Sequence, residues 1–184
     1  AVIALCQFDL TRCFGYPYTK DKGASLGAPL IDHLVGTYEN PPRSTVAQAY
    51  DFIIETLEEA VTLMSEEKNN GRMNKYAARA LLARIYLYHD DNRKAFDLAD
   101  QLIKDADTSG SYALYPHEKY VAAWSVEAKF GSESFFEIAN SVDDTPGRDS
   151  WGYLLNWYGY QKGFVTQKYA EQMLADPGDV RGQL

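Results

Sequence analysis

The segment from residue 77 to residue 96, AARALLARIYLYHDDNRKAF, limits the possible folds more than any other part of the chain. Wound at about 3.6 residues per turn, its first half carries apolar side chains on two sides, separated by Arg79 and Arg84. The broad stripe contains Ala77, Ala78, Leu81, Leu82, Ile85, Tyr86 and Tyr88, and the narrow stripe contains Ala80, Ala83 and Leu87. A helix that is apolar on two sides lies between neighbouring helices, and small residues let one neighbour approach closely. The segment therefore predicts stacked helical hairpins.

Helical periodicity recurs elsewhere in the chain. The first helix carries Ile3, Cys6, Leu10, Cys13 and Phe14 at helical spacing and ends at Gly15. Thr45 and Gln48 have the spacing of a capping box, and a long amphipathic helix follows them. Further helices are expected over residues 75–89, 93–106 and 165–175. Together these elements predict a helical scaffold over about residues 1–15, 45–106 and 165–176.

The remaining residues show no sustained period. Residues 16–43 are rich in glycine and proline, and residues 107–164 are rich in aromatic side chains. We expect both stretches to be irregular, apart from a short strand over residues 134–138. A chain of 184 residues fits one domain and can bury a sizeable core. The predicted fold is mainly α, a single domain over residues 1–184 with long irregular loops.

Charge and apolar content exclude several classes of protein. A net charge of −8 argues against nucleic-acid binding, which needs clustered lysine and arginine. No apolar run reaches the roughly 18 residues that a membrane span requires. Cys6 and Cys13 are separated by about 10 Å of helical rise, too far to pair with each other. We expect both to be buried thiols.

The chain offers no pattern typical of a catalytic or metal centre. His33, His89 and His117 share no ligand spacing, and no nucleophile elbow or phosphate loop is present. Residues 105–110 resemble the start of a calcium loop, but its twelfth position is Pro116 rather than glutamate. Residues 143–149 contain three aspartates and are interpreted as a solvated turn. We expect neither a cofactor nor catalysis.

The segment SWGYLLNWYGY, residues 150–160, is the strongest candidate for a binding site. Sugar rings present apolar C–H faces that stack on flat aromatic side chains, while their hydroxyl groups need polar partners. The candidate ligand-binding residues are Trp151, Tyr153, Asn156, Trp157, Tyr158 and Tyr160. Trp157 and Tyr158 are the first choices for stacking, and Asn156 and Gln161 supply amides. The alternative is that these aromatic residues only cover the helical scaffold.

A repeat pattern is partly matched in the central hairpin. A tetratricopeptide-type repeat expects a leucine and a small residue, then tyrosine, then alanine on the next helix. Leu82, Ala83, Tyr86 and Ala95 fit this order, whereas Arg79, Ala99 and Asp107 occupy positions where the pattern has other residues. The match covers about half of the signature, and an ordinary helical hairpin remains the alternative.

Five segments, taken in order, resemble the SusD/RagB family of bacterial outer-membrane glycan-binding lipoproteins. They are ALCQFDLTRCFGYPY, LGAPL, RSTVAQAYDFIIETLEEA, NNGRMNKYAARALLARIYLYHDDNRKAFDLA and SESFFEIANS. The third departs from the family pattern at Thr56, where aspartate is usual. The fourth is the closest match, and the resemblance covers nearly the whole chain.

The resemblance implies a tetratricopeptide-like scaffold with an irregular glycan-binding region. It also implies a lipid anchor on the outer face of the outer membrane and a TonB-dependent transporter as partner. The N-terminal lipobox and the C-terminal half of the family are not matched, so the chain is expected to be a fragment of a larger protein. The competing hypothesis is a helical-repeat adaptor for other proteins, which would place its contact residues along helix faces rather than in loops.

Overall fold

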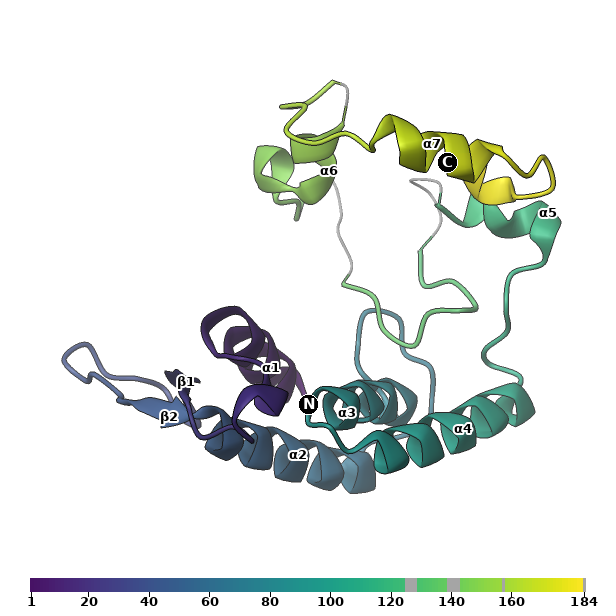
Figure 1. Cartoon of the computed structure of the whole chain (residues 1–184). Coiled ribbons are helices and arrows are strands. Elements are labelled where there is room, and N and C mark those ends of the chain that lie inside the picture. Colours follow the sequence, from purple (N-terminus) through teal and green to yellow (C-terminus); the bar gives the residue numbers. More distant parts are fainter. Residues whose placement is uncertain (125–128, 139–142, 157, 184) are drawn as a thin grey trace. The chain divides into compact units, whose positions relative to one another are not determined.

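The computed structural model describes residues 1–124, 129–138, 143–156 and 158–183 (Figure 1). Their contacts form two compact units. The helical unit comprises Ala1–Ala113 and Ser134–Phe136, and the aromatic unit comprises Leu114–Glu133 and Glu137–Leu184. The prediction of a mainly helical protein is confirmed. That the chain forms a single domain stays a prediction.

Four helices make up most of the helical unit. They are α1 (Val2–Phe14), α2 (Val46–Leu63), α3 (Lys75–Tyr88) and α4 (Asn92–Ser109), and a short 3-10 helix η1 (Tyr18–Lys20) follows α1. The predicted capping box starts α2: the Thr45 hydroxyl accepts from the Gln48 amide, and the Gln48 side chain accepts from the Thr45 amide. Both contacts satisfy amides that have no partner within the helix, which fixes where α2 begins.

The turn between α3 and α4 is as short as the sequence predicts. His89 ends α3, and its amide donates to the Ile85 carbonyl at 2.8 Å. Asp90 adopts a left-handed conformation with φ of 68°, and the Asp91 carboxylate then caps α4 by accepting from the Lys94 amide. The two helices contact each other along their length, so the predicted helix pair is confirmed. Its description as tetratricopeptide-like stays a prediction.

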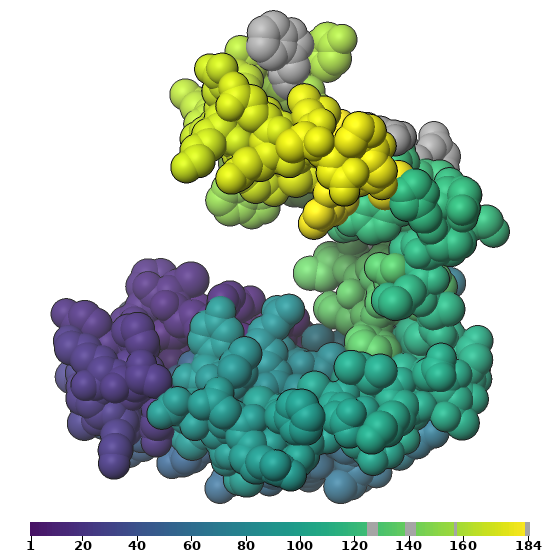
Figure 2. Space-filling model, turned by 45° about the vertical axis from the view of Figure 1, so that its right-hand side comes forward, coloured from purple at the N-terminus to yellow at the C-terminus, as the bar shows by residue number. Residues whose placement is uncertain are grey.

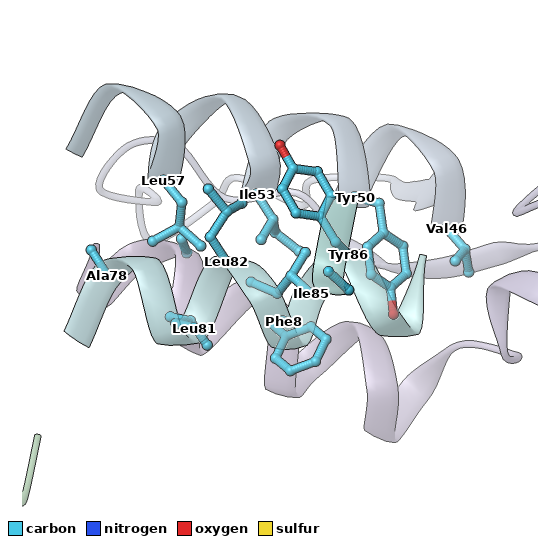
Figure 3. Packing of buried hydrophobic residues seen from close by; sticks show 12 residues of the cluster. Phe8, Val46, Tyr50, Ile53, Leu57, Ala78, Leu81, Leu82, Ile85 and Tyr86 are labelled. Atoms are coloured by element: carbon cyan, nitrogen blue, oxygen red, sulfur yellow. The ribbon is translucent and has the colours of Figure 1, made fainter. Parts of the chain in front are cut away.

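The core of the helical unit lies between α1, α2 and α3 (Figure 3). Its buried members are Ala4, Phe8, Val46, Tyr50, Ile53, Leu57, Ala78, Leu81, Leu82, Ile85, Tyr86 and Ala95. Most of the broad stripe of α3 is buried here, whereas Tyr88 remains 45% exposed. Burying a large aliphatic side chain contributes roughly 1.5–3 kcal/mol, so this cluster is the main source of stability.

The second side of α3 faces α4 and a smaller cluster. Ala80 packs against buried Tyr76, Leu102, Ala106 and Tyr112. Beside it, the Arg79 guanidinium pairs with the Asp105 carboxylate at 2.7 Å and lowers the pKa of that carboxyl. Leu87, the third member of the narrow stripe, is 56% exposed instead of buried. The two-sided burial that the sequence predicts therefore holds over the first turns of α3 and fails at its end.

Two strands interrupt the stretch that the sequence analysis assigns to irregular loop. β1 (Leu26–Pro29) pairs in antiparallel fashion with β2 (Arg43–Thr45), with Leu26 opposite Thr45 and Pro29 opposite Arg43. The Arg43 guanidinium donates to the carbonyls of Gly27 and Leu26, and the Ser44 hydroxyl donates to that of Ala28. Strands of three and four residues are too short for an alternating pattern, so periodicity does not predict them.

The prediction of buried thiols is wrong: Cys6 and Cys13 are both exposed. The other members of the predicted stripe of α1, Ile3, Leu10 and Phe14, are also exposed. The buried side of the helix carries Ala4, Gln7, Phe8 and Thr11. Gln7 can be buried because both ends of its side chain have partners. Its Nε2 donates to the Pro29 carbonyl at 3.1 Å, and its Oε1 accepts from the Ile31 backbone amide. The buried face of α1 thus combines the apolar packing of Ala4 and Phe8 with the hydrogen bonds of Gln7 to the strand region.

The predicted strand over residues 134–138 is absent. Phe135 instead packs in the smaller cluster, with its ring centroid 4.7 Å from that of Tyr112 and 6.2 Å from that of Tyr76. An extended segment becomes a strand only beside a partner strand, and here an aromatic contact takes its place.

The aromatic unit contains short helices. They are α5 (His117–Tyr120), α6 (Trp151–Leu155) and α7 (Gln167–Leu174), with 3-10 helices η2 (Ala122–Trp124), η3 (Gly147–Asp149) and η4 (Val180–Gln183). The last predicted helix is confirmed as α7. The helical turns α5 and α6 correct the prediction of a wholly irregular stretch. None of the described residues of this unit is classed as buried, so its large apolar rings remain accessible to solvent.

Candidate functional site

The candidate binding segment is built on α6. The Ser150 hydroxyl starts this helix by accepting from the Tyr153 amide at 3.1 Å. After the helix the chain doubles back: the Tyr160 amide donates to the Tyr153 carbonyl at 3.0 Å, and the Lys162 amide donates to the Leu154 carbonyl at 2.9 Å. Two backbone hydrogen bonds therefore hold the returning chain against α6.

Tyr153 and Tyr160 form the ordered centre of this segment. Their ring centroids are 5.2 Å apart and the rings are nearly perpendicular, at 82°. The turn between them needs a glycine at position 159, because a Cβ there would overlap the Tyr153 carbonyl oxygen. The absence of a side chain at Gly159 thus lets the two tyrosines approach each other.

Trp151 and Tyr158 present their rings to solvent, with 79% and 91% of their surface exposed. In Figure 2, yellow-green atoms of this part of the chain are visible at the surface, partly behind the yellow C-terminal residues. Trp157, one of the two first choices for stacking, lies outside the described residues. The candidate rings that the structure describes are therefore an exposed pair, Trp151 and Tyr158, beside an ordered pair, Tyr153 and Tyr160.

Asn156 stabilises the turn after α6 through two hydrogen bonds. Its side-chain oxygen accepts from the Tyr158 backbone amide at 2.8 Å, and its backbone amide donates to the Gly152 carbonyl. Gln161, the second amide that the sequence suggests, has a left-handed backbone with φ of 51°. Asn156 therefore fixes how Tyr158 leaves the turn, and its predicted role as a ligand-binding residue stays a prediction.

A second aromatic pair in the same unit, half-buried Tyr120 and exposed Trp124, was not among the predicted site residues. Tyr120 on α5 and Trp124 on η2 have ring centroids 6.1 Å apart, and Trp124 is 66% exposed. Their spacing of four residues, which places two side chains on the same side of a helical turn, was the available signal. Phe164, also 66% exposed, follows the candidate segment. Aromatic surface in this unit therefore extends beyond residues 150–160.

An ion pair follows α7 in the aromatic unit. Arg181 binds the Asp179 carboxylate through its guanidinium and its backbone amide, and these hydrogen bonds lower the pKa of Asp179 to about 2. His117 contacts the Gly178 carbonyl at 3.0 Å and so connects α5 with the segment after α7. Among the described residues, no group of three or more His, Cys, Asp or Glu side chains is placed to hold a metal ion.

Known proteins resemble this chain in both sequence and structure. A family profile described as "Starch-binding associating with outer membrane" matches residues 2–87. The crystal structure of a SusD superfamily protein from Bacteroides vulgatus is 99% identical over 100% of the chain, with a TM-score of 0.93. The chain belongs to the SusD-like family. The resemblance to SusD/RagB proteins that the sequence indicates is thereby confirmed.

Two further solved structures are more distant from the chain in sequence. A putative sugar binding protein from Bacteroides vulgatus is 40% identical over 95% of the chain, with a TM-score of 0.85. A SusD superfamily protein from Bacteroides thetaiotaomicron is 35% identical over 97%, with a TM-score of 0.82. The chain spans 41%, 39% and 39% of the length of these three structures. No curated protein sequence matches the SusD-like chain.

Among the described residues, no helix is both long and apolar enough to cross a membrane. The family description nonetheless places its members at the outer membrane.

Proposed function

We propose that the chain is part of a non-catalytic, outward-facing outer-membrane protein that binds oligosaccharide and passes it to a TonB-dependent transporter. Membership of a family described as starch-binding, together with a 40% identical neighbour named as a putative sugar binding protein, supports the ligand class. The transporter, a lipid anchor ahead of the chain and the outward orientation follow from the family resemblance.

The observation that carries the proposal is the exposed aromatic surface around α6. Trp151 and Tyr158 offer flat faces to a sugar ring, and the Tyr153–Tyr160 pair supports the turn beside them. Binding of this kind has modest affinity, about −4 to −8 kcal/mol for millimolar to micromolar dissociation constants. By analogy with base stacking, removing one ring costs roughly 1–3 kcal/mol.

Calorimetric titration of oligosaccharides tests the site. Binding should weaken in each of three single variants, Trp151→Ala, Trp157→Ala and Tyr158→Ala. The double variant Trp157→Ala, Tyr158→Ala should weaken it further. Phe96→Ala is the matched control, because Phe96 on α4 is an exposed ring (63%) of the helical unit. Unchanged affinity in all three variants and the double variant, for a glycan that the parent chain binds, would place the site elsewhere.

The absence of catalysis has its own test. Incubating the protein with a panel of polysaccharides and separating the products by chromatography should reveal no new reducing ends. Products that vanish when an acidic residue is substituted would show that the protein is a hydrolase.

One observation favours the second candidate, a helical module that binds another protein. Val2, Ile3 and Phe14 on the outer face of α1 are 59%, 55% and 66% exposed, and large apolar residues on a helix face are typical of protein contacts. Cys6 and Cys13 lie on the same helix and are exposed, so their labelling by a maleimide reports whether the face is covered. Protection that appears only when the transporter is co-expressed would support a protein-contact role. Equal labelling with and without the transporter would oppose it.

A further inference from the structure

The loop between β1 and β2, residues 30–42, extends away from the helices of its unit (Figure 1). Its two largest apolar side chains make almost no contact with the chain: Leu34 is 96% exposed and Tyr38 is 95% exposed. Apolar burial therefore does not hold this loop in shape, and its conformation depends on polar contacts.

Those polar contacts centre on His33. Its Nδ1 lies 2.6 Å from Asp32 Oδ1, and its Nε2 lies 2.8 Å from Glu39 Oε1. The second oxygen of Glu39 accepts from the Gly36 amide at 3.0 Å, and the Glu39 amide donates to the Gly36 carbonyl at 3.0 Å. The imidazole thus connects the start of the loop to the turn from Gly36 to Glu39.

Both histidine contacts require a charged ring. An ionised carboxylate only accepts hydrogen bonds, and a neutral imidazole has a single N–H to donate. A neutral ring would leave one nitrogen lone pair facing a carboxylate oxygen. The arrangement is therefore that of an imidazolium between two carboxylates, and the titratable groups that face the ring are Asp32 and Glu39.

We propose that residues 32–39 form a proton-operated clamp, closed only while His33 is positively charged and Asp32 and Glu39 are both ionised. Closing the clamp fixes the loop in the conformation that holds Leu34 and Tyr38 in solvent. Losing the proton of His33, or protonating either carboxylate, breaks one side of the bridge and frees the loop. The clamp belongs to the helical unit and is independent of the proposed glycan site.

The direction of each pKa shift defines the pH range in which the clamp closes. Hydrogen bonds to Asp32 and then to Glu39 raise the pKa of His33 above its ordinary 6.5. The pKa of Asp32 is lowered chiefly by His33, and that of Glu39 is lowered first by the Gly36 amide and then by His33. The clamp is therefore closed from below the ordinary carboxyl values, 3.8 for Asp32 and 4.5 for Glu39, to above pH 6.5. It opens on both sides of this range.

NMR of the whole chain tests the clamp. Steady-state heteronuclear NOE values of the Gly36 and Glu39 amides should be highest between about pH 5 and 6 and should fall toward pH 3 and pH 8. Amides of β1 and β2 serve as the control within the same unit and should stay rigid across the range. In the same spectra, the imidazole signal of His33 should titrate above its ordinary value.

Matched variants separate the clamp from a general pH effect. Asp32→Asn and Glu39→Gln should each lower the pKa of His33, because each removes one negative partner. Glu39→Gln retains an oxygen for the Gly36 amide, so the turn itself should survive. His33→Gln should leave the loop loose at every pH and remove the change between about pH 6 and pH 8, because glutamine carries no charge and does not titrate. Loop dynamics that do not depend on pH, or a His33 titration indifferent to both carboxylate substitutions, would overturn the proposal.

Discussion

The hydroxyl of Tyr86 on α3 donates a hydrogen bond of 2.5 Å to Glu58 Oε1 on α2. The Tyr86 ring belongs to the buried cluster, while its hydroxyl reaches the carboxylate at the edge of that cluster. Burial and then this hydrogen bond raise the pKa of Tyr86. A single side chain thus contributes apolar packing at one end and a polar link between two helices at the other.

Removing that hydroxyl should cost little but measurable stability. Tyr86→Phe keeps the ring in the core and loses the hydrogen bond, so we expect a loss of about 0.5–1.5 kcal/mol in the free energy of unfolding. Glu58→Gln retains an acceptor and should lose less. Urea unfolding followed by circular dichroism measures both, and equal stability of Tyr86→Phe and wild type would show that the link contributes nothing.

Alkaline pH should destabilise the helical unit through buried phenols. Burial raises the pKa of Tyr50 to about 12, and the pKa of Tyr86 is also raised. A group whose pKa is raised on folding stabilises the fold below its unfolded value, about 10, and this contribution disappears as the pH rises through the folded value. Melting temperature should therefore fall above about pH 10. The double variant Tyr50→Phe, Tyr86→Phe should show a shallower fall, and an unchanged slope would contradict the assignment.

Overpacking the helix pair should destabilise it. Ala83 and Ala95 are only 9% and 8% exposed, so a tryptophan at either position has no room without moving a neighbour. Ala83→Trp and Ala95→Trp should each cost at least roughly 1–3 kcal/mol. Ala113→Trp, at an exposed alanine of the same unit, is the control. Unchanged denaturation midpoints in the two buried variants would argue against the close contact.

Asn74 should contribute strongly to the stability of the helical unit. Its side-chain oxygen accepts from the Ala77 amide at the start of α3, while its nitrogen donates to the Tyr112 hydroxyl at 2.7 Å and the Glu67 carbonyl at 3.2 Å. Asn74→Ala loses the helix cap, which costs about 1 kcal/mol. It also leaves the buried Tyr112 hydroxyl and the Glu67 carbonyl without this donor.

Asn74→Asp separates these two contributions, because aspartate keeps the cap acceptor and lacks the donor. Its stability in chemical denaturation should lie between those of wild type and Asn74→Ala near neutral pH. An aspartate variant as stable as wild type would mean that the donated hydrogen bonds contribute nothing.

Gly159 should control the geometry of the candidate glycan site. Gly159→Ala introduces a Cβ that overlaps the Tyr153 carbonyl, so the turn must move and Tyr160 must separate from Tyr153. Gly152→Ala is the control, since its nearest neighbouring atom, Ser150 Oγ, would be 4.0 Å away. Near-ultraviolet circular dichroism should change and glycan affinity should fall at least several-fold in the first variant only. Equal spectra and equal glycan affinity in the two variants would show that binding does not depend on this turn.

Local sequence determined the helices and their ends. The capping pair Thr45 and Gln48, and the turn from His89 to Asp91, act within a few residues, so the bounds of α2, α3 and α4 follow from the chain itself. The two-sided apolar pattern of α3 likewise predicted that it packs between neighbours, as Leu82 and Ala80 show. The aromatic segment around α6 was also visible as a candidate site.

Tertiary contacts decided which surfaces are buried and what the polar side chains do. Gln7 can be buried because carbonyl and amide groups about two dozen residues away satisfy its side chain, and it shares the buried face of α1 with Phe8 while the predicted stripe faces solvent. Phe135 packs against Tyr112 instead of extending a sheet, and Asn156 holds a turn. Periodicity records the hydropathy of neighbours along the chain, whereas burial depends on partners distant in sequence, and only the folded chain brings those partners together.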